Sequence, residues 1–321
     1  MNTQKPAPTQ MRSLAQGLAD VLQIACQGRL GQITWFKADW QRGGAATGTA
    51  KYKINGDTYK QVVVKLPVVQ RELLWTRRLQ DDNDENLVIP KLYASGEILG
   101  GYDMAWIVIE RFEHGPLGLH WFDEHISHIA QAAARFHKAT SVHPIIEAPN
   151  SEDWNQLVHE SQDNLKINVI EHSDRWKSAL KTLRGKLKDI VSEWNARSID
   201  QWLHGDLHLA NAMSRVSIEQ GPVSLIDLAE VRPGHWIEDA IYLERQLWAN
   251  PSRLKAAKPV RAMARARKEL GLQNGEMYPR LATIRRALLA GTALRFLKNE
   301  GHPRYLEACL NWLERSLAEL K

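Results

Sequence analysis

Cysteine is scarce in this sequence. Only Cys26 and Cys309 occur among its 321 residues, which is too few for a disulfide framework. We therefore expect both side chains to be reduced thiols, as is usual in a cytoplasmic protein.

Long apolar runs are also absent. No stretch approaches the roughly 18 to 20 apolar residues that a membrane-spanning helix needs, and residues 1–14 have no apolar core like that of a signal peptide. These absences predict a cytoplasmic protein without a membrane partner. The hydrophobic content of 44% and the charged content of 25% are ordinary for a globular chain, and the length suits two domains or one large unit with two lobes.

Acidic residues are few in the C-terminal part. From residue 250 onward there are 15 Lys and Arg against 6 Asp and Glu, a local charge of +9. Seven of these bases lie between Arg253 and Lys268, where no acid occurs. The run indicates either a solvated helix face or one wall of a site for a neutral or anionic molecule. Nucleic acid is a less favoured partner, which a salt-dependent affinity would reveal.

The N-terminal third predicts a small antiparallel sheet. Short segments rich in β-branched and aromatic residues alternate with turn signals such as Asn55-Gly56-Asp57 and Gly100-Gly101. We expect strands within 33–40, 49–54, 61–67, 92–98 and 104–112, and helices within 12–26 and 68–79.

The rest of the chain predicts a mainly helical domain. Helical periodicity covers 126–140 and 175–194. Two apolar strands around polar loops interrupt it between 201 and 231. We therefore predict an α+β fold of two domains, a β-rich one over residues 1–113 and a helical one over residues 114–321.

The polar loop at 204–211 carries the clearest chemical signal. It reads His-Gly-Asp-Leu-His-Leu-Ala-Asn, and Asp227 follows Asn211 by 16 residues. Phosphoryl transfer needs one carboxylate that orients the attacking hydroxyl and accepts its proton, and oxygen ligands that hold magnesium on the phosphates. Asp206 suits the first task, and Asn211 and Asp227 suit the second. Alternatively, His-Gly-Asp is a plain turn and Asn211 caps a helix.

This arrangement resembles the catalytic and metal loops of the aminoglycoside phosphotransferase and choline kinase superfamily, which is related to the protein kinases. The resemblance covers residues 30–250 and includes the spacing from Asp227 to Asp239. It implies a bilobal protein-kinase-like fold with ATP and Mg²⁺ as cofactors. By the same resemblance Asp206 is the catalytic base, Asn211 and Asp227 are the magnesium ligands, and Asp239 supports the catalytic loop.

The resemblance also assigns a nucleotide site to the N-terminal half. Lys65 lies on an expected strand, like the kinase lysine that pairs with the α- and β-phosphates. Glu72 is the only acid from residue 66 to 80 and is the natural partner of Lys65. The spacing of seven residues is shorter than in protein kinases, so a role as a surface helix residue stays open for Glu72.

Two further segments complete the expected nucleotide site. The glycine-rich loop 41–48 lacks the protein-kinase pattern, and it is either a flexible turn or a loop whose backbone approaches phosphates. The segment around residues 110–118 resembles the kinase hinge. These segments supply the candidate nucleotide contacts Gly43, Gly44, Thr47 and Gly48 in the loop, and the backbone of Glu110 and Phe112 in the hinge.

We therefore expect an ATP- and Mg²⁺-dependent phosphotransferase that modifies a hydroxyl of a small molecule, such as a sugar, an amino sugar or a choline-like alcohol. The alternatives are a choline/ethanolamine-type kinase and a pseudokinase-like regulatory module that binds nucleotide. Glu230 is not at the spacing typical of choline kinases. The aromatic residues Trp236, Tyr242, Trp248 and Trp312 form either a cage for a quaternary amine or parts of the core.

Overall fold

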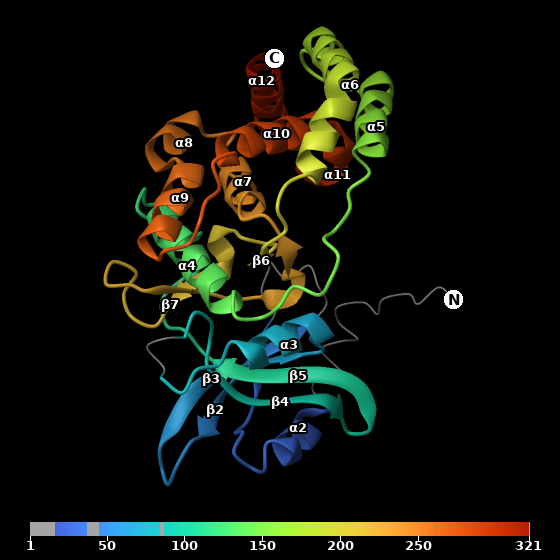
Figure 1. Ribbon diagram of the computed structural model, residues 1–321. Helices are drawn as coiled ribbons and strands as arrows, with labels where there is room; N and C mark the ends of the chain where they lie inside the picture. Colours follow the sequence, from blue (N-terminus) through green and yellow to red (C-terminus); the bar gives the residue numbers. More distant parts are fainter. Residues whose placement is uncertain (1–16, 37–44, 84–86, 321) are drawn as a thin grey trace. The chain divides into compact units, whose positions relative to one another are not determined.

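The chain forms two compact units in the computed structural model, which describes residues 17–36, 45–83 and 87–320 (Figure 1). The sheet unit comprises residues up to Leu119 together with Ala210–Val231, and the helical unit comprises His120–Leu209 and residues from Arg232 onward. This division differs from a single boundary at residue 113, because the segment 210–231 folds with the sheet.

The sheet unit contains five antiparallel strands in the order β1-β2-β3-β5-β4. The turn between β4 and β5 is Gly100-Gly101, with φ of 58° and 83°. A two-residue hairpin turn of this kind needs positive φ at both central positions, which glycine adopts without strain. The elements are β1 (Thr34–Phe36), β2 (Ala46–Lys53), β3 (Tyr59–Leu66), β4 (Leu92–Leu99), β5 (Tyr102–Glu110), α2 (Ala19–Ala25) and α3 (Gln70–Arg78).

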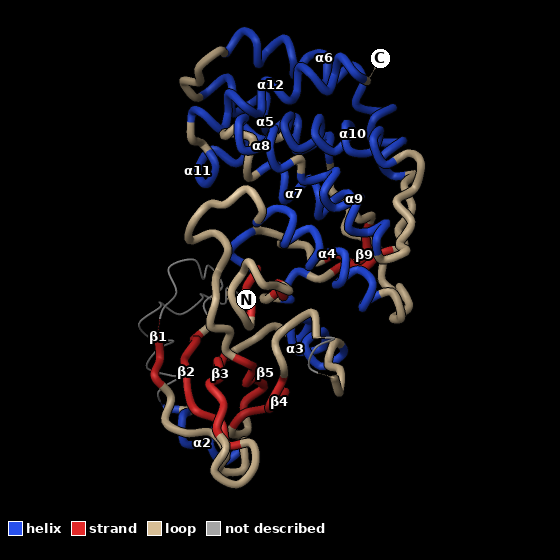
Figure 2. Tube along the Cα trace, turned by 90° about the vertical axis from the view of Figure 1, so that its left-hand side faces the viewer, coloured by secondary structure: helices blue, strands red, loops and turns tan. Residues whose placement is uncertain are grey.

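The two helices of this unit cover opposite faces of the sheet (Figures 1 and 2). Val62, Val64 and Leu66 of β3 belong to the cluster that contains Leu22 of α2. Successive strand residues point to opposite faces, so Lys65 lies on the face covered by α3. There Leu73 of α3 packs in a second apolar cluster.

A short hairpin joins the sheet unit from far along the sequence. It consists of β7 (Ala212–Ser214) and β8 (Val223–Leu225), which pair antiparallel. Arg215 Nη2 donates to Glu110 Oε2 at the end of β5 over 2.7 Å, and the Leu225 N–H donates to the Val88 carbonyl over 3.0 Å. These contacts explain why the hairpin belongs to the sheet unit.

The helical unit confirms the helices predicted over 126–140 and 175–194, which are α4 and α6. Its strands β6 and β9 form a two-stranded antiparallel ladder. The elements are α4 (His125–Thr140), α5 (Trp154–Ile167), α6 (Ser173–Asn195), β6 (Gln201–Leu203), β9 (Arg232–Gly234), α7 (Ile237–Arg245), α8 (Pro251–Ala257), α9 (Pro259–Glu269), α10 (Tyr278–Gly291), α11 (Leu297–Glu300) and α12 (Pro303–Glu319).

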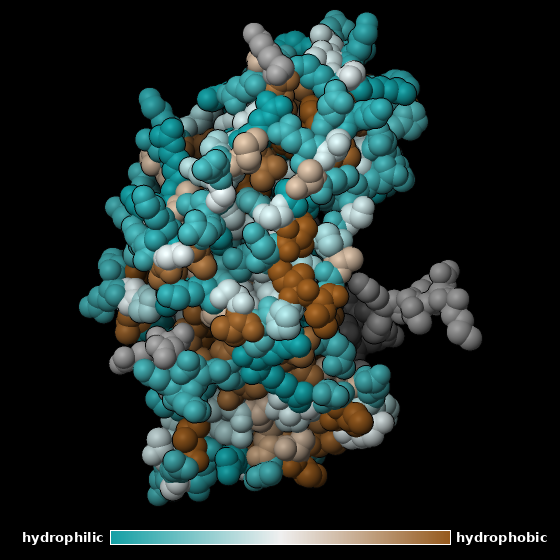
Figure 3. Space-filling model, viewed as in Figure 1, coloured by the Kyte–Doolittle hydropathy of each residue, from teal (hydrophilic) through white to brown (hydrophobic). Residues whose placement is uncertain are grey.

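Helix α7 lies in the core of the helical unit. It contacts α9 and α10, and most of its side chains are buried, including the polar Glu238, Asp239 and Glu244. Buried charges need hydrogen-bond or ion-pair partners, so these three positions mark polar networks inside the unit. By contrast, hydrophilic residues cover most of the visible surface of the unit (Figure 3). Within the described residues, no helix combines the length and apolar character needed to cross a membrane.

Candidate active site

Lys65 connects three elements of the sheet unit through its ammonium group. Its Nζ lies 2.8 Å and 2.9 Å from the two carboxylate oxygens of Glu72 on α3, and 3.1 Å from Oδ1 of Asp227. Burial alone would lower the pKa of Lys65, but the two carboxylates raise it above its ordinary value. The ammonium therefore stays charged.

The short spacing between Lys65 and Glu72 has a local cause. Helix α3 begins at Gln70, four residues after the end of β3 at Leu66. Glu72 therefore lies in the first turn of the helix and reaches back to the strand face on which Lys65 lies. A glutamate further along α3 would lie farther from Lys65, since each helical residue adds about 1.5 Å along the axis.

The β7–β8 hairpin brings Asn211 and Asp227 to the same end. Ala212 pairs with Leu225, so the residues just before β7 and just after β8 lie side by side. The Ile226 N–H donates to the Asn211 carbonyl over 3.0 Å. Asp227 has a φ of 64°, a left-handed backbone that is unusual for a residue with a side chain.

The donors at this hairpin end suit a magnesium ion. Magnesium prefers oxygen ligands and is commonly held by one or two carboxylates together with substrate phosphates. Asn211 offers an amide oxygen, and Asp227 offers a carboxylate whose side chain is 43% exposed. The residues present therefore fit the ion that the sequence predicts.

In the helical unit, Asp206 is held by two hydrogen-bond partners. The Tyr242 hydroxyl donates to its Oδ1 over 2.7 Å, and His208 Nε2 lies 3.3 Å from its Oδ2. Burial raises the pKa of Asp206, but the hydrogen bonds from His208 and Tyr242 outweigh it and lower the pKa to about 2. The carboxylate is therefore ionised at neutral pH, and its orientation is fixed by α7.

Asp239 holds the backbone of the same loop. Its carboxylate accepts hydrogen bonds from the His204 N–H over 2.9 Å and the Gly205 N–H over 3.0 Å, and its Oδ2 lies 3.0 Å from His137 Nε2. Burial raises the pKa of Asp239, but these donors lower it below its ordinary value. Asp239 thus supports the loop around Asp206, in the position expected from the family resemblance.

His137 and Arg267 extend this network, and neither is among the candidate residues predicted from the sequence. Arg267 Nη1 lies 3.0 Å from His137 Nδ1 and 3.2 Å from Gln201 Oε1. Burial lowers the pKa of His137, so its ring is neutral. Nδ1 then accepts from Arg267, and Nε2 donates its proton to Asp239.

Arg267 corrects one interpretation of the basic run. The interpretation of the run as a solvated helix face is wrong for Arg267, because only 4% of this residue is exposed. The buried positions of α9 include Val260, Met263, Ala264 and Arg267, a spacing of i, i+3, i+4 and i+7. That spacing defines the buried face of a helix, and it is the signal that could have identified Arg267.

The glycine-rich loop is only partly described. Gly43 and Gly44 lie outside the described residues, whereas Thr47 and Gly48 lie within β2 and not in a loop. A Cβ at Gly48 would come within 2.6 Å of Ile33 Cγ2 and 3.0 Å of the Thr34 carbonyl oxygen. The close packing of β1 therefore explains why position 48 is a glycine.

The expected hinge residues have structural roles for their side chains. The Glu110 carboxylate is paired with Arg215, whose guanidinium also lies 4.9 Å from the centre of the Phe112 ring. The Glu110 N–H donates to the Lys91 carbonyl over 2.8 Å. In the part of the chain that is described, the Phe112 N–H donates to no backbone carbonyl.

The four aromatic residues considered as a cage lie in different surroundings. Trp248 stacks on Trp312 with ring centroids 5.7 Å apart, and Trp236 packs against Tyr278 at 5.3 Å. Tyr242 instead binds Asp206. Trp236 and Trp248 are each only 1% exposed, so core packing is the better description of these two.

Comparisons with known proteins place the chain in a family. The model of the phosphotransferase enzyme family matches residues 41–283, more than half of the chain. A comparison with curated protein sequences found no match.

Several solved structures share the fold at low sequence identity. An aminoglycoside phosphotransferase from Alicyclobacillus acidocaldarius is 16% identical, with a TM-score of 0.55 over 91% of this chain and 92% of that one. A choline/ethanolamine kinase family protein from Mesorhizobium loti is 11% identical, with a TM-score of 0.54 over 96% and 95%. A spectinomycin phosphotransferase in complex with ADP and spectinomycin is 13% identical, with a TM-score of 0.53 over 94% and 97%.

These likenesses confirm the predicted α+β, kinase-like fold, and the match to the family model confirms the predicted family. The chain belongs to the phosphotransferase enzyme family and is a phosphotransferase.

Proposed function

We propose that this enzyme transfers the γ-phosphoryl group of ATP to a hydroxyl of a small molecule, such as a sugar, an amino sugar, a choline-like alcohol or a related metabolite. The observation that carries the proposal is the cluster of Lys65, Glu72 and Asp227. Phosphoryl transfer depends mainly on positioned charges, and this cluster places one cation and two carboxylates on one face of the sheet. The ADP bound to the spectinomycin phosphotransferase supports an adenine nucleotide as the donor.

The sheet unit would bind the nucleotide. Lys65, fixed by Glu72, would pair with phosphate oxygens, and the start of β2 with the preceding glycine-rich segment would approach the phosphates through backbone N–H groups. The backbone of Glu110 and Phe112 would meet the adenine edge. The Phe112 N–H, which donates to no backbone carbonyl among the described residues, supports this assignment.

Asn211 and Asp227 would hold Mg²⁺ at the end of the β7–β8 hairpin. When bound, this ion would neutralise negative charge on the phosphates. The partly exposed carboxylate of Asp227 supports the assignment.

Asp206 would receive the acceptor hydroxyl. Its pKa of about 2 makes it a weak base, so its main contribution is to orient the hydroxyl by accepting a hydrogen bond from it. In the loose transition state of phosphoryl transfer, the bond between the γ-phosphorus and the departing ADP would break, the new O–P bond would form, and the proton would pass to this carboxylate. Tyr242 and His208 hold the carboxylate in place before the acceptor arrives.

We favour a neutral or anionic acceptor. The side chains next to Asp206 within the helical unit include Tyr242 and His208, and Arg245 on the same helix is paired with Glu300. A polycationic acceptor needs several free carboxylates for charge complementarity. Besides Asp206, the acid among these side chains is Glu300, and it is already paired with Arg245.

The test is a coupled ADP-release assay with purified enzyme, Mg-ATP and a panel of hydroxyl compounds at low salt. The panel compares neutral sugars, choline, anionic hydroxy acids and kanamycin-like aminoglycosides. We expect turnover with a neutral or anionic member and little with aminoglycosides. Efficient phosphorylation of an aminoglycoside would contradict the acceptor preference, and the absence of Mg-ATP binding would contradict the proposed donor.

A further inference from the structure

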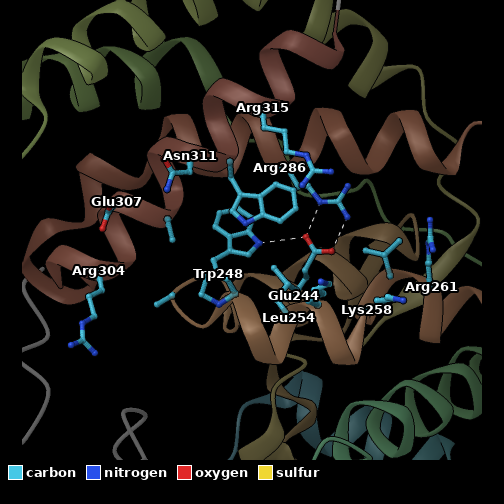
Figure 4. A pocket seen from close by; sticks show the side chains of 16 residues that line it. Glu244, Trp248, Leu254, Lys258, Arg261, Arg286, Arg304, Glu307, Asn311 and Arg315 are labelled. Carbon is cyan, nitrogen blue, oxygen red and sulfur yellow. Dashed lines mark hydrogen bonds and ion pairs between the residues drawn. The ribbon is translucent and has the colours of Figure 1, made fainter.

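A cavity of about 900 Å³ lies within the helical unit (Figure 4). Small-molecule sites in proteins commonly have volumes of roughly 300 to 1,000 Å³. Side chains from α7, α8, α9, α10 and α12 line this cavity, so it is formed by packed helices and not by a single loop.

The lining of the cavity is strongly basic. Its wall has six basic and two acidic side chains, a surplus of four positive charges. Arg286 is neutralised by Glu244, with Nε–Oε1 and Nη2–Oε2 distances of 2.7 Å. Within the described parts of the chain, none of the lining residues Lys255, Lys258, Arg261 and Arg304 has an ion-pair partner closer than 4.0 Å. Clustered cations without counterions favour an anionic ligand.

Trp312 gives the cavity a partly exposed aromatic ring, and the buried Trp248 stacks on it. Trp248 lies near the centre of the view in Figure 4, and its ring plane is 29° from that of Trp312. The guanidinium groups of Arg286 and Arg315 lie 5.0 Å and 5.3 Å from the centre of the Trp312 ring. Aromatic faces favour contacts with flat rings. Arg286 and Arg315 are already paired with Glu244 and Glu319, so an anion would meet the other bases of the lining.

The cavity lies on the other side of α7 from the Asp206 loop. Asp239, Tyr242 and Gln246 all bond to this loop, and their spacing of three and four residues places them on one helix face. Glu244 lines the cavity and is two residues from Tyr242. Residues two apart on a helix point in nearly opposite directions, so the cavity is not the part of the helical unit that faces Asp206.

We propose that this cavity is a second ligand site, for a small organic anion in which a flat ring carries a phosphate or carboxylate group. The ring would pack against Trp312, and the oxyanion would lie among the unpaired bases. The site is independent of the phosphotransfer proposed above, because it uses none of the residues placed in that reaction.

The probe for this site is 1-naphthyl phosphate, titrated into the full chain by calorimetry. 1-Naphthoate tests a carboxylate in place of the phosphate, while 1-naphthol and inorganic phosphate test the ring and the anion separately. We expect both naphthyl anions to bind with about tenfold or higher affinity than either 1-naphthol or inorganic phosphate, and added salt to weaken them.

Two double variants with the same change in charge locate the site. Lys255→Glu with Arg261→Glu alters exposed bases of the lining, and we expect about tenfold or greater loss of affinity. Arg265→Glu with Lys268→Glu alters exposed bases on α9 that do not line the cavity, and the affinity should change by about twofold or less.

Three results would overturn the proposal. The first is no binding of either naphthyl anion to the parent protein. The second is an equal loss of affinity in the two double variants, which would indicate a general charge effect. The third is a loss of binding in Lys65→Ala, which would place the anion at the phosphotransfer site. Since binding is measured without turnover, failure of this proposal is distinguishable from failure of the proposed reaction.

Discussion

The two units use charged residues in different ways. In the sheet unit, Lys65, Glu72 and Asp227 form a cluster in which the Asp227 side chain is 43% exposed. In the helical unit, Asp239 and His137 are almost fully buried, and their polar atoms bond to the loop around Asp206 and to Arg267. The first arrangement can still take up a charged ligand, whereas the second is already complete.

The contrast follows from the cost of burying charge. A buried carboxylate is tolerated only when donors satisfy it, and Asp239 has the His204 and Gly205 N–H groups and His137 as partners. An exposed carboxylate keeps its water until a ligand displaces it. We therefore assign ligand binding to the sheet-unit cluster and loop support to the helical-unit network, and the following variants test that division.

The largest effect is expected from Asp206→Ala. Loss of the carboxylate that orients the hydroxyl should lower kcat by about 10² or more, while Mg-ATP affinity stays within about threefold because Asp206 is not assigned to the metal. Steady-state ADP release and nucleotide titration measure the two quantities. Tyr242→Phe is the matched control, since it removes one hydrogen bond and keeps the carboxylate. Near-normal kcat in the alanine variant would contradict the assignment.

Asp227→Ala tests the open cluster. Without this carboxylate, Mg-ATP should lose most of its thermal stabilisation of the protein, which is about 2.7 kcal/mol at a ligand concentration of 100 Kd. Thermal unfolding with and without Mg-ATP measures the change. Glu230→Ala, an exposed acid three residues away, should behave like the parent. Equal stabilisation of the Asp227 variant and the parent would show that Asp227 is not a ligand.

Asp239→Asn tests the buried network. The amide cannot accept from all the donors that the carboxylate satisfies, so the free energy of unfolding should fall by about 2 kcal/mol. Mg-ATP should raise the free energy of unfolding of this variant by as much as it does for the parent. Chemical denaturation measures the loss, and Asp174→Asn at an exposed helix position is the control. A loss of Mg-ATP affinity without a loss of stability would contradict the division of roles.

The smallest effect concerns acid pH and His235. Burial lowers the pKa of His235 to about 4, whereas its pKa in the unfolded chain is about 6.5. Between these two pH values the unfolded chain therefore binds more protons than the folded protein. The free energy of unfolding should therefore fall as the pH falls. We expect His235 to account for about 1 kcal/mol of the loss between pH 7 and pH 5.5. Chemical denaturation at the two pH values should give a smaller difference in the free energy of unfolding for His235→Asn than for the parent. An unchanged difference would mean that His235 is not responsible.

Much of the fold was predictable because it depends on local patterns. The Gly100-Gly101 turn and helices α4 and α6 follow from turn chemistry and from helical periodicity. The family followed from the short loop 204–211 and from the spacing to Asp227 and Asp239, because the residue types in that loop are set by chemistry.

Other features depended on contacts between distant residues. The membership of 210–231 in the sheet unit rests on contacts such as Arg215 with Glu110, which are 105 residues apart. The burial of Arg267 depends on His137, 130 residues away. No local pattern pairs such residues, although the periodicity of α9 indicates that Arg267 faces inward.

The sequence by itself therefore determined the family, the reaction class and the candidate residues, since these depend on which side chains stand at which spacing. Only the tertiary structure decided their partners. It placed Glu72 and Asp227 on Lys65, Tyr242 on Asp206, and the two tryptophans and the unpaired bases around one cavity. The physical reason is that burial and pairing are set by packing between elements, and packing determines whether a charge is solvated, neutralised or available to a ligand.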